Sequence, residues 1–176
     1  MGLGADWGPR AFTLLELLAV IAVVAILTAI VIGAGQSAVE RGKVARARAE
    51  LAVLAAALES YKATHGDFPR TDDSSHFLQA LMGQRGPDQR RHAGRALIDA
   101  ARFTMSADPQ GNETAVLLDP WGQPYVYAYK SAPGWINPAY VLSSPGPDQL
   151  NYGTLLSGGF PDVTAPGNAD NIHAGQ

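Results

Sequence analysis

A continuous apolar run near the start of the chain constrains its fold more than any other feature. From Phe12 to Ile32 every residue is apolar or small except Thr13, Glu16 and Thr28. As an α-helix that rises about 1.5 Å per residue, this run spans roughly 30 Å, which is the thickness of the hydrocarbon core of a membrane. The run therefore predicts a membrane-spanning helix.

The segment before this run bears on whether the helix is kept. In an ordinary secretory signal the cleavage site follows the apolar stretch, so that the stretch is discarded. Here the small residue Ala11 precedes the run, which favours a cut between Ala11 and Phe12 and retention of the helix. The hydrophobic pattern alone is equally consistent with an uncleaved single-pass anchor or with a cut near Gly33 to Gly35.

Glu16 is the residue that separates these interpretations. An ionised carboxylate inside an apolar run costs about 2.5 to 3.5 kcal/mol at the centre of a membrane helix, so it usually has a partner. A cut after Ala11 would give Phe12 a free ammonium group one helical turn away, in the same chain or in a neighbouring copy. Such an ion pair could set the register between copies. The alternative is a Glu16 carboxyl that reaches water at the membrane interface.

Residues 11–27, AFTLLELLAVIAVVAIL, resemble the type IV prepilin signature. The resemblance implies that prepilin peptidase removes the leader before Phe12 and methylates the new terminus, and that Glu16 aids assembly into a homopolymer. It also implies an inner-membrane assembly platform as a partner, and membrane lipid around the helix before assembly. The family prefers Gly before the cut, where this chain has Ala11.

A second apolar pattern extends the helix beyond the membrane. A stripe at offsets of four, three, four and three predicts that the helix continues to about Thr64, and it consists of Ala47, Leu51, Leu54, Leu58 and Tyr61. The predicted organisation is a leader over 1–11, a transmembrane and assembly helix over 12–35, its amphipathic continuation over 36–64, and a globular head over 65–176.

Charge near the helix gives a conflicting indication of orientation. Residues 41–48 hold four basic side chains, which by the positive-inside rule would place the head in the cytoplasm. The prepilin resemblance implies the opposite, a single-pass protein of the bacterial inner membrane with a periplasmic or extracellular head. We follow the resemblance because the basic residues are interleaved with Glu in a predicted helix.

The head is predicted to be α+β. Residues 77–82 and 92–103 have the pattern of short helices, and 116–118, 125–129 and 140–143 have that of strands in a small antiparallel sheet. Asp119-Pro120-Trp121-Gly122 has the chemistry of a tight turn between the first two strands. The apolar stripe of the long helix is expected to cover one face of the sheet, which gives a pilin-like fold.

A second resemblance concerns the head. Tyr61, Gly66, Phe68-Pro69, the segment 119–125 and the segment 144–148 are similar to the major pseudopilin of type II secretion systems. The resemblance implies a structural subunit that polymerises through its N-terminal helix with itself and with other pseudopilins to support protein secretion. A type IV pilin or minor pilin of a surface fibre, serving adhesion, motility or DNA uptake, shares the same N-terminal features and is the alternative.

The pseudopilin resemblance also implies a calcium ion in the loop after the last strand. Matched by position, its ligands would be Leu142, Ser144, Asp148, Asp170 and Asn171. Calcium takes six to eight hard oxygens from carboxylates, amides and main-chain carbonyls, so these residue types suit it. The segment between Asp148 and Asp170 is longer than in the family, and ordinary Asp residues in a Gly- and Pro-rich loop are the alternative.

Other functions find little support in the composition. A net charge of −3 and no concentrated basic face argue against nucleic acid as a partner, although a membrane-tethered binding module using the arginines of 85–95 is a further alternative. The absence of cysteine excludes disulfides and thiolate chemistry. The four histidines have no i, i+4 ligand spacing, and no Ser lies in a nucleophile elbow, so we predict no catalysis.

Overall fold

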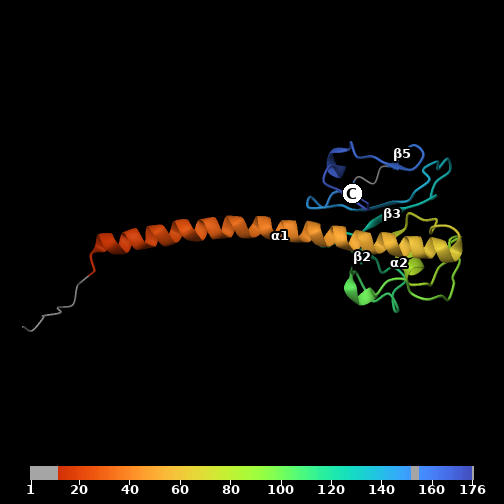
Figure 1. Ribbon diagram of the computed structural model, residues 1–176, viewed down its shortest axis with the longest axis horizontal. Helices are drawn as coiled ribbons and strands as arrows, with labels where there is room; N and C mark the ends of the chain where they lie inside the picture. Colours follow the sequence, from red (N-terminus) through yellow and green to blue (C-terminus); the bar gives the residue numbers. More distant parts are fainter. Residues whose placement is uncertain (1–11, 152–154, 176) are drawn as a thin grey trace, which may run out of the picture. The chain divides into compact units, whose positions relative to one another are not determined.

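The computed structural model describes residues 12–151 and 155–175, with the backbone alone for residues 30–36. The first helix, α1, covers Leu14–His65 (Figure 1). The chain divides into two compact units, one ending at Val39 and the other beginning at Glu40, and α1 contributes to both. We describe each unit separately.

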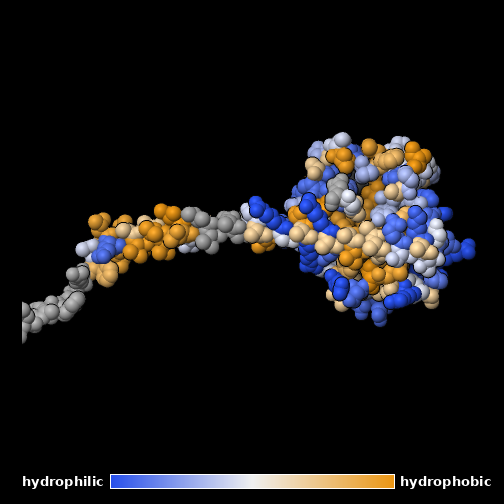
Figure 2. Space-filling model, viewed as in Figure 1, coloured by the Kyte–Doolittle hydropathy of each residue, from blue (hydrophilic) through white to orange (hydrophobic). Residues whose placement is uncertain are grey.

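The first unit contains the apolar part of α1. The large apolar side chains from Phe12 to Leu27 are 53–82% exposed, and Figure 2 shows a mostly orange surface there with a blue patch near its start. A helix that is apolar on all sides is found where other helices or lipid cover it. Among the residues that the structure describes, no helical segment is both long and apolar enough to cross a membrane.

The second part of α1 has the predicted stripe. Its five members, Ala47, Leu51, Leu54, Leu58 and Tyr61, are all 0–1% exposed, which confirms the helical pattern. The helix ends at His65, one residue beyond the expected boundary, because Gly66 adopts a left-handed conformation with φ of 82°. The Gly66 N–H donates to the Lys62 carbonyl at 2.8 Å, which completes the C-terminal cap.

The second helix, α2, covers Ser74–Leu81 and agrees with the helix expected over 77–82. It begins earlier because the Asp73 carboxylate accepts hydrogen bonds from the Ser75 and His76 N–H groups at 2.7 and 3.1 Å. Its Phe77 ring stacks on Tyr127 with centroids 4.4 Å apart, which joins α2 to the sheet.

The prediction of a helix over 92–103 is wrong. Only the 3₁₀ turn η1, Ala100–Arg102, forms there. The N–H groups of His92, Gly94 and Leu97 donate to carbonyls of residues 84, 83 and 81, at 2.7–2.8 Å. These bonds to the end of α2 replace the i to i−4 bonds that a helix needs, so tertiary pairing overrides the local pattern.

Antiparallel strand pairs complete the head and confirm an α+β fold. The central sheet has the order β3-β4-β7, and two-stranded pairs are formed by β1 with β2 and by β5 with β6. The elements are β1 Thr104–Met105, β2 Leu117–Leu118, β3 Val126–Ala128, β4 Val141–Ser144, β5 Leu155–Leu156, β6 Phe160–Pro161, η2 Pro166–Asn168 and β7 Ile172–His173.

The two faces of the central sheet have different surroundings. Tyr125, Tyr127, Leu142 and Ile172 belong to the hydrophobic core together with the first four members of the α1 stripe, as predicted. The residues that alternate with them lie on the opposite face, where the register pairs Val126 with Ser143, Ala128 with Val141, and Ser143 with His173. Residues of the C-terminal segment lie opposite this second face, across a cavity.

Candidate functional site

The predicted assembly residues lie at the start of α1. Glu16 is in the first turn, and its N–H donates to the Thr13 hydroxyl at 3.2 Å, which caps the helix. Its neighbour Phe12 is 77% exposed. Ala11, the residue before the predicted cut, lies outside the described residues. The start of α1 therefore presents the Glu16 carboxylate on a largely apolar surface, and the assembly role of Glu16 stays a prediction.

The Asp119–Gly122 turn has a second role that sequence reasoning missed. The buried Asp119 carboxylate accepts the N–H groups of Trp121 and Gln123, both at 2.9 Å, and the Ser144 hydroxyl at 2.6 Å. The turn directs the Trp121 indole N–H to Glu40 in α1, at 2.9 Å. This bond, followed by the ion pair with Lys43, lowers the pKa of Glu40. The turn thus connects the helix to the sheet.

A second polar connection lies inside the head. Glu50 is only 8% exposed, because it projects from α1 towards the sheet. Its carboxylate accepts the Tyr125 hydroxyl at 2.6 Å and the Arg46 Nε–H at 2.7 Å. Arg46 also donates to the Thr104 hydroxyl at 3.2 Å. Burial and the bond to Glu50 both raise the pKa of Tyr125, so its hydroxyl stays protonated.

A third connection closes the end of α1. The Asp67 carboxylate accepts hydrogen bonds from the Phe68 N–H, the Tyr129 hydroxyl, the Arg70 guanidinium and the Lys130 ammonium, at 2.8–3.2 Å. Burial raises the pKa of Asp67, but these bonds outweigh it and lower the pKa to about 2. Asp67 therefore ties the segment after α1 to the residues that follow β3.

The predicted calcium ligands are brought together only in part. The Asp148 N–H donates to Asp170 Oδ2 at 3.0 Å, so these two residues meet across the loop. Leu142 and Ser144 lie on β4 and are already engaged. The Leu142 carbonyl accepts the Ala174 N–H at 2.9 Å, and the Ser144 hydroxyl is bound to Asp119.

One observation in this loop fits a cation. The Oδ1 atom of Asn171 is buried and has no hydrogen-bond partner among the described residues. Buried polar atoms are rarely left unpaired in native proteins. Asn171 adjoins Asp170, which in turn meets Asp148. The loop therefore offers three groups with hard oxygen donors close together: the Asn171 amide oxygen and the carboxylates of Asp170 and Asp148. No group of three or more His, Cys, Asp or Glu able to hold a metal occurs in the part of the chain that the structure describes.

Comparison with known protein families shows to which family the chain belongs. The model of the type II secretion system protein G family matches residues 36–158, and the model of the prokaryotic N-terminal methylation motif matches residues 9–32. The chain belongs to the type II secretion protein G family. It is also 30% identical over 144 residues to the type II secretion system core protein G of Pseudomonas aeruginosa, covering 81% of this chain and 87% of that protein. No solved structure gave a significant match.

Membership of the protein G family confirms the resemblance drawn from the head and favours the pseudopilin over the pilin of a surface fibre. The methylation motif includes Ala11, Phe12 and Glu16, the residues predicted for processing and assembly. The protein G match ends at residue 158, so Asp170 and Asn171 lie beyond it. The calcium ligands at the end of the loop therefore rest on the sequence resemblance and on the geometry described above.

Proposed function

We propose that this protein G family member is a major-pseudopilin-type structural subunit of a type II secretion pseudopilus and has no catalytic role. The observation that carries the proposal is the family match over residues 36–158 together with the methylation motif over residues 9–32. The structure is consistent with this role, because a self-contained head follows a helix segment whose apolar side chains are exposed and require cover.

Assembly in this proposal proceeds through the N-terminal helix. Prepilin peptidase cuts between Ala11 and Phe12 and methylates Phe12. Before assembly, the subunit is anchored in the inner membrane with its head in the periplasm. An assembly platform then moves it into a filament of copies of itself and other pseudopilins. Glu16 pairs with the terminal ammonium of Phe12, and in a water-poor bundle this ion pair stabilises one register between subunits over the others.

The first test is the mass and N-terminal sequence of the membrane-derived protein, from cells with and without prepilin peptidase. The expected mature chain begins at methylated Phe12 only when the peptidase is present. Glu16→Ala should be processed normally but should yield few filaments, whereas Glu59→Ala, on an exposed part of α1, should assemble as the wild type does. A chain that begins at Met1 or near Gln36 would contradict the proposed processing.

We also propose that the loop from Asp148 to Asn171 binds calcium. Support comes from the proximity of Asp148 and Asp170 and from the unpaired oxygen of Asn171. Calcium held there would join the two ends of the loop, a useful constraint in a chain without cysteine. A carbonyl from the main chain and water would be needed to reach six oxygens.

Thermal unfolding of the full chain in detergent tests the calcium proposal. A calcium concentration 100-fold above the dissociation constant should add about 2.7 kcal/mol to the free energy of unfolding. Magnesium should add much less, because it requires a tighter octahedral site. Asp170→Asn should remove the calcium effect, while Asp99→Asn, in an exposed turn remote in sequence, should retain it. Equal stabilisation of both variants would refute this site.

A further inference from the structure

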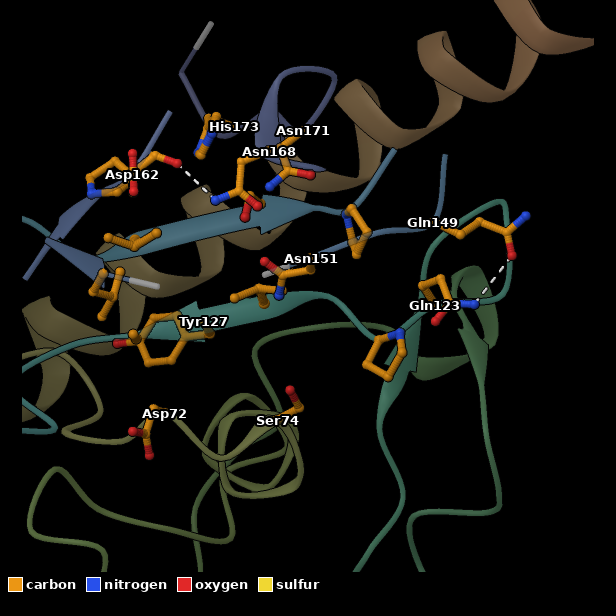
Figure 3. Close-up of a pocket in the computed structure, with 18 residues that line it drawn as sticks. Asp72, Ser74, Gln123, Tyr127, Gln149, Asn151, Asp162, Asn168, Asn171 and His173 are labelled. Carbon is orange, nitrogen blue, oxygen red and sulfur yellow. Dashed lines mark hydrogen bonds between the residues drawn. The ribbon is translucent and has the colours of Figure 1, made fainter. Parts of the chain in front are cut away.

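A cavity of about 520 Å³ lies against the face of the central sheet that does not pack on α1 (Figure 3). The sheet contributes six residues to its wall, namely Val126, Tyr127, Ala128, Val141, Ser143 and His173. The C-terminal segment contributes a second wall that includes Pro161, Asp162 and Asn168. The cavity therefore lies between the sheet and its cover, and its wall shares Tyr127 with the hydrophobic core.

Small side chains are the reason that this space is not filled. Ala128 and Ser143 are 4% and 3% exposed, yet neither belongs to the core cluster on the other face. Within the cover, the Asn168 side-chain amide donates to the Asp162 carbonyl at 2.7 Å. The volume is within the usual range of about 300 to 1,000 Å³ for small-molecule sites.

His173 provides an unsatisfied polar group in the wall. Its Nε2 atom is buried and has no hydrogen-bond partner within the described residues. A neutral ring nitrogen can donate or accept a hydrogen bond according to its tautomer. An occupant with a polar group near His173 would satisfy an atom that the protein leaves unpaired.

The charges around the cavity select the sign of the occupant. Asp72 and Asp162 line it, and none of the described residues in its wall is Lys or Arg. Hydrogen bonds from the Thr164 hydroxyl and N–H lower the pKa of Asp162, so this carboxylate is ionised. A cation is therefore attracted and an anion repelled. The wall also offers apolar surface to the uncharged part of the occupant, through Val126, Val141 and Pro161.

We propose that this cavity binds a small organic cation, an amine whose apolar stem lies on the face of β3 and β4 and whose charged end lies towards Asp162. The same chemistry could be supplied by a free amine or by a lysine side chain of another polypeptide. The site uses neither Asp148 nor Asp170, but Asp162 lies within the proposed calcium loop and Asn171 lines the cavity, so the two proposed sites are neighbours.

Three probes with one stem and different charge test the proposal: hexylamine, hexanol and hexanoate. Binding to the full chain in detergent micelles would be followed by the NMR signals of the His173 ring and of the Val126 and Val141 methyl groups. We expect hexylamine to bind at least threefold more tightly than hexanol, and hexanoate not to bind. Nα-acetyl-lysine amide distinguishes the two sources, because a site that admits only free amines will not bind this blocked lysine.

Two variants and one control distinguish binding of hexylamine in the cavity from its partition into the micelles. Ala128→Leu adds volume to the cavity and should weaken hexylamine binding at least tenfold, whereas Ala52→Leu, on the exposed side of α1, should not change it. Asp162→Asn keeps the acceptor for Thr164 and should reduce hexylamine to the affinity of hexanol. Should Ala128→Leu fail to fold, the Asp162→Asn result decides alone. Equal binding of hexylamine and hexanoate, or an unchanged preference in Asp162→Asn, would overturn the proposal.

Discussion

Replacing Asp67 with Asn should destabilise the head by about 2 to 3 kcal/mol. Arg70 and Lys130 are 52% and 42% exposed, so each ion pair contributes less than about 1 kcal/mol. The Tyr129 hydroxyl and the Phe68 N–H lie in partly buried surroundings and contribute about 1 kcal/mol each. The asparagine keeps the shape of the side chain but loses its charge and one acceptor oxygen.

The pH dependence of the same variant gives an independent check. The folded-state pKa of Asp67, about 2, lies below its ordinary value of 3.8, so its stabilisation is complete above about pH 5 and is lost as the pH falls towards 2. The shift corresponds to about 2.4 kcal/mol, which solvent screening reduces to about 1 to 2 kcal/mol. The difference between wild type and Asp67→Asn should therefore shrink by that amount on acidification.

Urea unfolding of the full chain in detergent, followed by near-ultraviolet circular dichroism, measures both effects. Asp88→Asn is the matched control, because Asp88 and its partner Arg90 are 57% and 87% exposed and their removal should change the free energy of unfolding by less than about 0.5 kcal/mol. An Asp67→Asn variant no less stable than Asp88→Asn, or a difference from wild type that stays constant from pH 5 to pH 2, would refute the reasoning.

Three further substitutions probe other contacts of the head. Glu40→Gln should shift the indole N–H resonance of Trp121 and speed its hydrogen exchange, because the charged acceptor is lost; an unchanged signal would show that the contact is not formed in solution. Tyr125→Phe should cost about 2 to 3 kcal/mol in urea unfolding, since it leaves the buried Glu50 with one partner fewer, and a cost below about 0.5 kcal/mol would argue against that network. Gly159→Ala should cost about 2 to 4 kcal/mol, because φ is 84° and a Cβ would lie 2.4 Å from a tryptophan ring; a neutral effect on the melting temperature would contradict this packing.

Patterns set by nearest neighbours along the chain were predictable. The stripe from Ala47 to Tyr61 has a period that only a helix satisfies, and its burial follows. The Asp119–Gly122 turn and its flanking strands were likewise predictable, because the turn residues and the alternation are local. The methylation motif is equally local, so the residues around Phe12 are sufficient to predict processing at that position.

Features that depend on distant partners could not be predicted in this way. The segment 92–103 has helical composition, but its N–H groups pair with residues 81–84, and no local pattern signals that pairing. The contact between Trp121 and Glu40 joins residues far apart in sequence, and neither residue type indicates the other. The cavity beside His173 also depends on how the C-terminal segment covers the sheet.

Carboxylates take over the tethering role that disulfides serve in many exported domains. The chain has no cysteine, and three of its acidic side chains, Glu50, Asp67 and Asp119, each accept hydrogen bonds from at least two other segments or residues of the head. Two of these connections involve α1 or its end, on either side of the buried Leu54 and Leu58, so apolar packing fixes the helix face and polar contacts fix its position along the sheet. Such a head should be indifferent to reducing agents but sensitive to acid, the opposite of a disulfide-stabilised domain. That difference follows from hydrogen-bonded carboxylates alone and does not require the head to be assembled into a filament.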